Sequence, residues 1–297
     1  MFKPRENQAE ILAYHSGKMG ISAVPGSGKT HTLSYLAAQL IVRGNLAIDQ
    51  EILIVTLVNS AVDNFTTRIA GFCKEARLLE NVGYRVRTLH GLAHDILQER
   101  PDLVGLSNQF SIIDEIESNR MIEQIAIAYA RLHPEIAQYV LKPDVDPVQL
   151  SRSPNGWNEL IISLNQNFIQ QAKDLQGEPE QIIQKMRQYE YSDVLLEMGI
   201  EVYQQYQRGL RYRNALDFAD LIRLADQALQ NDLNYLERLR YRWPYILEDE
   251  AQDSSSLQEQ MLRRLVGENG NWVRVGDTNQ AIYESFTTAS PQFLKNF

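Results

Sequence analysis

The sequence is poor in cysteine and has no long apolar run. Cys73 is the single cysteine among 297 residues, so no disulfide can form within the chain, which favours a reducing compartment. No stretch approaches the roughly 20 apolar residues that a membrane-spanning helix needs. Residues 1–8 also lack the apolar core of a signal peptide. We therefore expect a cytoplasmic protein that does not associate with membranes.

Positive charge is scarce as well. The chain has 29 Lys and Arg against 38 Asp and Glu, a formal net charge of −9. A strongly basic domain is the usual electrostatic sign of a nucleic-acid binder, and that sign is missing here. A local basic groove can still exist if acidic surface elsewhere offsets it. The length suits about two domains, and the 44% of hydrophobic residues is ordinary for a globular protein.

The most informative stretch is residues 23–30, Ala-Val-Pro-Gly-Ser-Gly-Lys-Thr. A short apolar run, 19–24, leads into it, and apolar residues at helical spacing follow from His31 to Val42. Glycines between a strand and a helix let consecutive N–H groups point inward, where the helix N-terminus adds partial positive charge. The stretch therefore predicts a phosphate-binding loop, in which Lys29 reaches the β- and γ-phosphates and the Thr30 hydroxyl ligates Mg²⁺. A turn that carries a lysine by chance is the alternative, and both flanks argue against it.

Further apolar runs predict an α/β fold. Residues 52–57 and 84–88 are typical of short buried strands, and a helical pattern follows each of them. Such βα units imply a parallel sheet covered by helices, and ligands of these sheets lie at the carboxyl ends of the strands. Four polar residues fall at the predicted strand ends: Thr56, Asn59, Thr88 and His90. On the residues alone, each is better explained as a turn or capping residue.

The middle of the chain changes pattern. Residues 116–132, 157–175 and 180–208 have helical periodicity, several prolines separate the first two, and residues 110–114 fit either a short strand or a helix entry. No alternating strand pattern is present, which predicts an all-helical subdomain inserted into the α/β core. We place the core at residues 1–98 and 212–297 and the helical subdomain at residues 99–211.

A second part of the same site is predicted near the C-terminal end. An apolar strand, 245–248, ends in Asp249 and Glu250. In a phosphate-loop NTPase, one such carboxylate holds Mg²⁺ and the other orients and deprotonates the attacking water. A last strand, 272–275, leads to Gln280, a polar group placed to sense the γ-phosphate. Two aromatic residues follow that either stack on bases or pack in the core: Tyr283 and Phe286.

These features together resemble the superfamily 1 helicases of the UvrD/Rep type. The resemblance covers nearly the whole chain, and seven motifs occur in the family's order. They lie at Gln8, residues 23–30, 55–61, 88–91 (Thr-Leu-His-Gly), 216–221 (Leu-Asp-Phe-Ala-Asp-Leu), 245–253 and 275–283. Any one of them would be weak evidence, whereas the ordered set is specific. The family also carries a helical insertion between its fourth and sixth motifs.

The resemblance implies a RecA-like ATP-binding core and roles for individual residues. The catalytic residues would be Lys29, Glu250 and Gln280. The residues that hold the nucleotide would be Gln8, Pro25, Gly26, Ser27, Gly28, Lys29, Thr30, His31 and Gln252. The Mg²⁺ ligands would be Thr30 and Asp249. The contacts to single-stranded DNA would be Thr56, Asn59, Thr88, His90, Tyr283 and Phe286. ATP and Mg²⁺ are the implied cofactors.

The family couples ATP hydrolysis to translocation on single-stranded DNA and to unwinding at duplex junctions. Its members also have a second RecA-like domain with arginine fingers, which these 297 residues do not include. We therefore expect a monomeric N-terminal half of a longer helicase, which needs that second domain as its partner. Arginine fingers accelerate related phosphoryl transfers by about 10³–10⁵, so the chain alone should bind nucleotide weakly and hydrolyse it poorly.

Departures from the family pattern keep two other functions in view. Leu57 replaces a family phenylalanine, Ser60 a basic residue and His31 a common arginine. After Tyr283, the run 284–289 departs from an aromatic residue followed by Arg-Gly-Ala. The altered DNA motifs would allow a nucleotide-gated module that binds or loads DNA without unwinding it. A phosphate-loop enzyme acting on a small molecule is the other possibility, and the box at 249–253 argues against it.

Overall fold

The computed structural model describes residues 4–24, 26–140 and 156–277. The chain forms two compact units. The core unit comprises residues 1–104 and 224–297, and the insert comprises residues 105–223. The division falls within the helix α11 (Phe218–Asn231).

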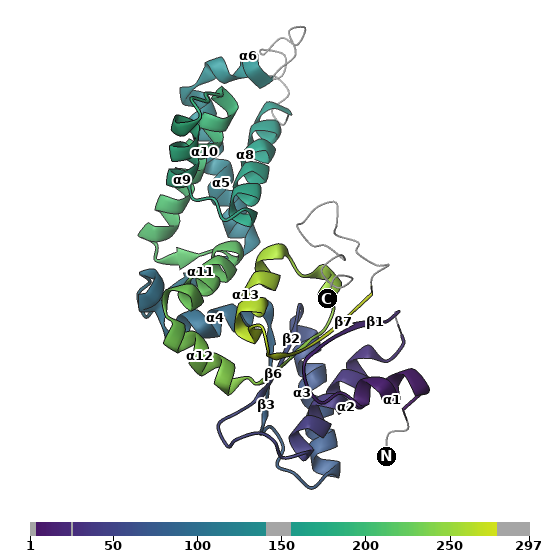
Figure 1. Ribbon diagram of the computed structural model, residues 1–297. Coiled ribbons are helices and arrows are strands. Elements are labelled where there is room, and N and C mark those ends of the chain that lie inside the picture. The colour runs from purple at the N-terminus through teal and green to yellow at the C-terminus, as the bar shows by residue number, and fades with distance from the viewer. Residues whose placement is uncertain (1–3, 25, 141–155, 278–297) are drawn as a thin grey trace. The chain divides into compact units, whose positions relative to one another are not determined.

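The core unit is built on a parallel sheet, whose strands in the described residues run in the order β1-β7-β6-β2-β3 (Figure 1). Their bounds are β1 Lys18–Ser22, β2 Ile52–Thr56, β3 Tyr84–Thr88, β6 Tyr245–Glu248 and β7 Asn271–Gly276. The apolar run of β2 is buried on both faces of the sheet, as continuous β-branched runs in parallel sheets are. The predicted α/β fold is confirmed.

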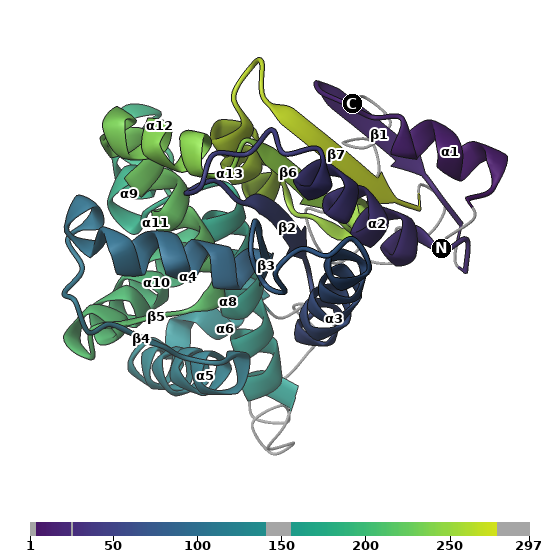
Figure 2. The same cartoon turned by 90° about the horizontal axis from the view of Figure 1, so that it is seen from below.

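Helices cover both faces of this sheet, as Figure 2 shows. Three of them pack on one face: α1 Glu6–Leu12, α2 Lys29–Val42 and α3 Asn59–Glu75. Their apolar residues form one core cluster with the sheet, including Leu36 and Phe65 against Ile54, Leu247 and Val273. The other face is covered by α4 Leu89–Glu99, α12 Leu233–Arg242 and α13 Ser256–Val266. Short 3₁₀ helices span Pro101–Val104 and Ala251–Asp253.

The insert is mostly helical, with a core of its own. Its helices are α5 Glu115–Leu132, α6 Ala137–Val140, α8 Gly156–Asp174, α9 Pro179–Gln188 and α10 Val194–Tyr212, with a 3₁₀ turn at Pro134–Ile136. It also contains a short parallel pair, β4 Ser111–Ile112 and β5 Ala215–Leu216, so it is not all-helical. Residues 110–114 contain this strand and also lead into α5.

The expected single helix over residues 180–208 is wrong. The chain leaves α9 after Gln188, and Glu190 adopts a left-handed conformation with φ of 49°, which interrupts a right-handed helix. Asp193 then begins α10, because its carboxylate accepts a hydrogen bond of 2.9 Å from the Leu196 N–H. Apolar periodicity alone runs through such a break, since the residues on both sides pack on the same core.

A buried charged cluster fixes the end of the insert. The Lys173 ammonium, 2% exposed, donates to the carboxylates of Asp217 and Asp220, the latter at 2.7 Å. The Tyr206 hydroxyl donates to Asp217 at 2.7 Å. Burial works to raise the pKa of Asp220, but the charges of Lys173 and Arg223 hold it below its usual value. The two acids of the motif at 216–221 therefore balance a buried lysine.

The core unit offers a matched test of apolar packing. Leu36 on α2 is fully buried, whereas Leu79 is 76% exposed. We expect Leu36→Ala to lower the free energy of unfolding by about 2–5 kcal/mol, since it leaves a cavity. Leu79→Ala should change it by less than about 0.5 kcal/mol. Urea unfolding followed by circular dichroism measures both values, and equal losses in the two variants would contradict this assignment of the core.

Candidate functional site

The loop at residues 23–28, which the sequence predicts to bind phosphate, connects β1 to α2. Its backbone turns at Gly26 and Gly28, whose φ angles of 72° and 86° lie in the left-handed region that favours glycine. The Ala23 N–H donates to the Gly276 carbonyl at 2.9 Å, which fixes the start of the loop to the end of β7. Pro25 lies outside the described residues.

Gln8 ties α1 to this loop. Its side-chain amide donates to the Ser27 carbonyl at 3.3 Å and accepts from the Arg5 N–H at 3.0 Å. A Cβ atom added at Gly28 would lie 3.3 Å from the same amide nitrogen. A glycine at this position therefore serves both the loop conformation and the close approach of Gln8.

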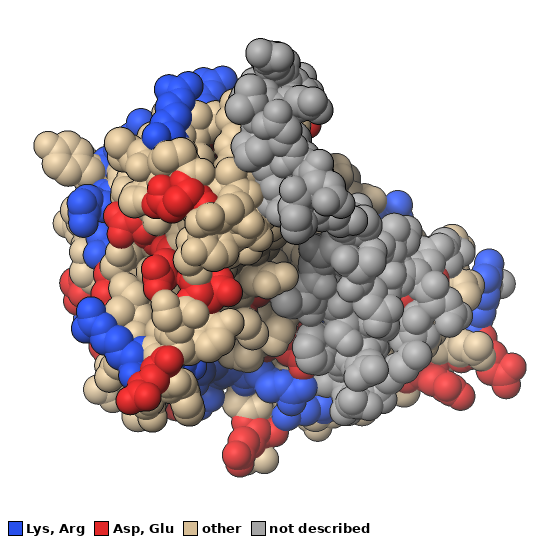
Figure 3. Space-filling model, turned by 90° about the horizontal axis from the view of Figure 1, so that it is seen from above, with Lys and Arg blue, Asp and Glu red and all other residues tan. Residues whose placement is uncertain are grey.

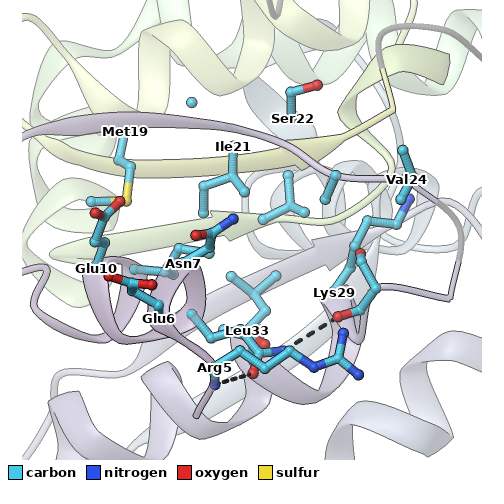
Figure 4. A pocket seen from close by; sticks show the side chains of 17 residues that line it. Arg5, Glu6, Asn7, Glu10, Met19, Ile21, Ser22, Val24, Lys29 and Leu33 are labelled. Carbon is cyan, nitrogen blue, oxygen red and sulfur yellow. Dashed lines mark hydrogen bonds between the residues drawn. The ribbon is translucent and has the colours of Figure 1, made fainter.

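A cavity of about 720 Å³ lies beside the loop. Both Gln8 and Lys29 line it, together with side chains from α1, β1 and α2. Figure 4 shows Asn7 and Glu10 on one side and Met19 and Ile21 on the other. Its volume is in the range of pockets for small organic ligands. The sequence interpretation did not select Arg5 and Asn7, which also line the cavity; their nearness to Gln8 in the chain was the available signal.

Lys29 contacts Glu250, although the two residues are 221 positions apart in the chain. The Lys29 ammonium lies 2.7 Å from a Glu250 carboxylate oxygen. Glu250, two residues after the end of β6, has φ of 54°, an uncommon conformation for a residue other than glycine. The Gln252 amide donates to the same Glu250 oxygen at 3.0 Å and accepts from the Asp277 N–H at 2.9 Å. Lys29, Glu250 and Gln252 are thus brought together.

Asp249 lies beside them and is buried, with 4% of its surface exposed. Burial, and then the nearby charge of Glu250, raises its pKa to about 6, although Lys29 and the Thr30 hydroxyl act in the opposite direction. Its Oδ1 atom is buried and has no hydrogen-bond partner among the described residues. A buried oxygen left unpaired is costly, and one that also lies near a threonine hydroxyl suits a hard cation.

These residues fit Mg²⁺. The ion is usually held by one or two carboxylates together with substrate phosphates and water, so a site with the single carboxylate of Asp249 and the hydroxyl of Thr30 is of the expected kind. Among the described residues, no group of three or more His, Cys, Asp or Glu side chains is arranged to bind a metal. The cage of protein ligands that a stand-alone metal site needs is therefore not seen there.

The four predicted DNA contacts in the described residues differ in exposure. Asn59, the first residue of α3, is exposed, whereas Thr56, at the end of β2, is 1% exposed. Thr88 is paired with Thr56 across the sheet and caps α4 by accepting from the Gly91 N–H at 3.0 Å. His90 is half-buried, and burial lowers its pKa.

Besides Pro25, the predicted site residues Gln280, Tyr283 and Phe286 lie outside the described residues. His31, a predicted nucleotide contact, packs edge-on against the Phe72 ring, with the ring centres 5.3 Å apart.

On the face shown in Figure 3, the described acidic and basic side chains are both present, without a broad basic field. In the described part of the chain, no helix is both long and apolar enough to cross a bilayer.

Comparison with known proteins gives a consistent set of relatives. A family model described as the UvrD/REP helicase N-terminal domain matches residues 5–297. The chain is 31% identical to the ATP-dependent DNA helicase UvrD1 of Mycobacterium tuberculosis (strain ATCC 25618 / H37Rv), over 99% of this chain and 35% of that protein. It is 30% identical to the ATP-dependent DNA helicase PcrA of Leuconostoc citreum, over 93% and 32% of the two chains. It is 27% identical to the DNA helicase II of Escherichia coli (strain K12), over 94% and 34%. The chain therefore spans about a third of the length of these relatives.

The raised pKa of Asp249 makes the site unfavourable for folding at neutral pH. The folded-state pKa of this carboxyl is about 6, against an ordinary 3.8, so the folded protein binds its proton more tightly than the unfolded chain does. The resulting contribution to stability is fully present below pH 4 and is lost as the pH rises through 6. Above pH 6.5, we expect Asp249→Asn to exceed the wild type in free energy of unfolding by up to roughly 3 kcal/mol, and therefore to unfold at a higher temperature. Near pH 4, the two proteins should unfold at the same temperature.

Thermal unfolding from pH 4 to 8, without nucleotide or divalent cations, measures this difference. The exposed Asp63→Asn serves as the control and should follow the wild type throughout. If Asp249→Asn is no more stable than the wild type at pH 7.5, the carboxylate is not disfavoured by its surroundings.

Proposed function

The chain belongs to the family of the UvrD/REP helicase N-terminal domain, and from this premise we propose that it is the ATP-binding part of an ATP-dependent DNA helicase. The observation that carries the proposal is the meeting of Lys29 and Glu250 at 2.7 Å, beside a buried Asp249. Phosphoryl transfer to water requires a cation for the phosphate, a ligand for Mg²⁺ and a base for the water. In this proposal Lys29, Asp249 and Glu250 supply these groups at one edge of the sheet.

Each residue of the site has a distinct task in this proposal. Lys29 and the N–H groups of the loop bind the phosphates of ATP, while Gln8 recognises the base from the cavity beside α1. Thr30 and Asp249 hold Mg²⁺, which when bound offsets the negative charge of the phosphates. Glu250 orients the attacking water and takes its proton. Pro25, Gly26, Ser27, Gly28, His31 and Gln280 complete the proposed set.

The contact between Lys29 and Glu250 also suggests an order of events. At 2.7 Å, the two groups leave no room for a phosphate between them. Binding of ATP must therefore draw the Lys29 ammonium from Glu250 to the phosphate oxygens. This exchange frees the Glu250 carboxylate, so the base becomes available only when its substrate is present.

Gln252 is the proposed connection between nucleotide and DNA. It contacts Glu250 and the backbone of Asp277, which directly precedes the segment with Gln280, Tyr283 and Phe286. We propose that these two aromatic residues, with Thr56, Asn59, Thr88 and His90, contact single-stranded DNA at the strand ends. Single-stranded DNA and duplex junctions are then the proposed substrates, and we propose a cytoplasmic location.

The proposed domain arrangement assigns the core unit as the RecA-like domain and the insert as the helical subdomain, near the predicted bounds of 99–211. A second RecA-like domain is the proposed partner, which supplies arginine fingers, and the assembled helicase acts as a monomer. Leu57 and Ser60, at the predicted DNA motif, favour one alternative: a nucleotide-gated module that loads DNA without unwinding it. ATP-driven translocation of the full-length protein along single-stranded DNA would exclude that alternative.

The proposal predicts that ATP hydrolysis is stimulated by single-stranded DNA and depends on Glu250. In the full-length protein, we expect Glu250→Gln to lower kcat by about 10²–10⁴, since it removes the general base, while ATP still binds. Lys29→Ala should instead abolish tight ATP binding. The exposed Glu75→Gln is the matched control and should keep full turnover. The 297-residue chain alone should show little hydrolysis.

Steady-state phosphate release with and without single-stranded DNA measures turnover, and a fluorescent ATP analogue measures binding. Turnover that is insensitive to Glu250→Gln would contradict the assigned base. Duplex unwinding by the 297 residues alone would contradict the need for a second domain.

A further inference from the structure

A buried charged cluster lies directly behind the acidic turn of the proposed ATP site. It comprises Glu248 on β6, Arg274 on β7 and Glu259 on α13, which are 1%, 0% and 3% exposed. Glu248 and Arg274 are paired across adjacent parallel strands. Their side chains lie on the sheet face opposite to the apolar cluster that contains Leu247 and Val273. None of these three residues has a task in the proposed reaction.

Glu248 is bound from three directions. Its Oε2 atom accepts from the Arg274 Nε at 2.7 Å and from the Trp272 indole N–H at 3.1 Å. Its Oε1 atom accepts from the Ser254 hydroxyl at 2.9 Å and from an Arg274 Nη2 at 3.3 Å. Arg274 in turn lies 3.4 Å from Glu259 and stacks over the Trp272 ring at 4.6 Å. This carboxylate is therefore held in one orientation by several directional bonds.

The bond from Ser254 to Glu248 closes the turn that carries the proposed catalytic groups. Asp249, Glu250 and Gln252 all lie between these two residues in the chain. The same turn is held a second time at Gln252, which accepts from the Asp277 N–H. Since Asp277 follows Arg274 by three residues on the same strand segment, two links join the turn to β7.

We propose that Glu248, Arg274 and Ser254 are positioning residues for ATP hydrolysis, which fix the turn at 249–253 so that Glu250 points at the γ-phosphate side of the loop. The inference rests on the proposed function, because it assigns how the base of that reaction is held. The Glu250 backbone is in a left-handed conformation, so the turn needs outside support to keep this geometry.

The burial of charge supports positioning over simple stabilisation. Removing an arginine and two carboxylates from water is costly, and an apolar set of similar volume is often as stable or more stable. An apolar set, however, has no direction and cannot bind the Ser254 hydroxyl. Misplacement of a catalytic group by about 1 Å can cost about 10²-fold in rate. The cluster therefore acts on the rate through geometry.

The mildest test is Ser254→Ala in the full-length protein. It removes one donor to Glu248 and leaves the charges in place. We expect kcat for DNA-stimulated ATP hydrolysis to fall by about tenfold, while KM for ATP and the midpoint of thermal unfolding stay close to the wild-type values. The expected loss is in kcat alone because the phosphate loop is untouched. Wild-type kcat in this variant would overturn the closure of the turn by Ser254.

A double variant separates positioning from stability. Glu248→Met with Arg274→Met replaces the ion pair by apolar side chains, and Glu259 keeps its partner Arg263, at 2.5 Å. We expect a folded protein with a lower unfolding midpoint than the wild type, because the buried Trp272 indole and Ser254 hydroxyl lose their acceptor. Well below that midpoint, we expect an unchanged KM and a kcat lowered by about 10²-fold. If the pair served only stability, the folded variant would keep the wild-type kcat, and that result would overturn the proposal.

Arg264→Met is the matched control, since Arg264 lies on α13, the helix that carries Glu259. It breaks the contact between Arg264 and the buried Asp226, at 2.7 Å, away from the acidic turn, and should leave kcat unchanged. Lys29→Ala and Glu250→Gln are measured in parallel. If these two variants keep full turnover, the proposed function fails. If they lose it while Ser254→Ala and the double variant keep it, only the present inference fails.

Discussion

The contact between Lys29 and Glu250 is the constraint on which the rest of the core depends. It requires the phosphate loop after β1 and the acidic turn after β6 to reach the same edge, although 221 positions separate the two residues in the chain. A parallel sheet meets this requirement because the carboxyl ends of its strands share one edge. Since β7 lies between β1 and β6, its own end, at Gly276 and Asp277, is placed between the two halves of the site.

The site is unfavourable in itself, and the packing around it offsets the cost. Asp249 is buried with a raised pKa, and Glu250 occupies a left-handed conformation. A free polypeptide would relieve both by exposing the carboxylate and straightening the turn. Here β6 is flanked by β2 and β7, and the Asp249 N–H donates a hydrogen bond to the Val55 carbonyl at 3.0 Å. The framework thus holds charged groups where a phosphate and a cation would relieve them.

Much of the site could be predicted from the sequence because its signals are local. The loop at 23–30 and the acids after 245–248 each lie beside a recognisable strand, and parallel pairing then brings strand ends together. The cluster of Glu248 and Arg274 could not be predicted, since it depends on which strands are neighbours and on their register. The helix break at Glu190 was also missed, because one residue with positive φ leaves no mark on apolar periodicity. The pair β4–β5 is too short to show alternation.

The Lys29–Glu250 pair has a further consequence for how such a site is controlled. Lys29, the proposed cation for phosphate, and Glu250, the proposed base, lie 2.7 Å apart and neutralise each other. Under the proposed function, the pair would weaken the affinity for ATP by the free energy needed to separate it, while it keeps an unpaired carboxylate from lying beside Asp249. In the proposed site Lys29 reaches both the β- and the γ-phosphate, so ATP and its diphosphate product would both compete with Glu250 for the ammonium, and ATP would carry the greater negative charge. Under the proposed function, the contact would then favour ATP over its product only to the extent of that additional charge.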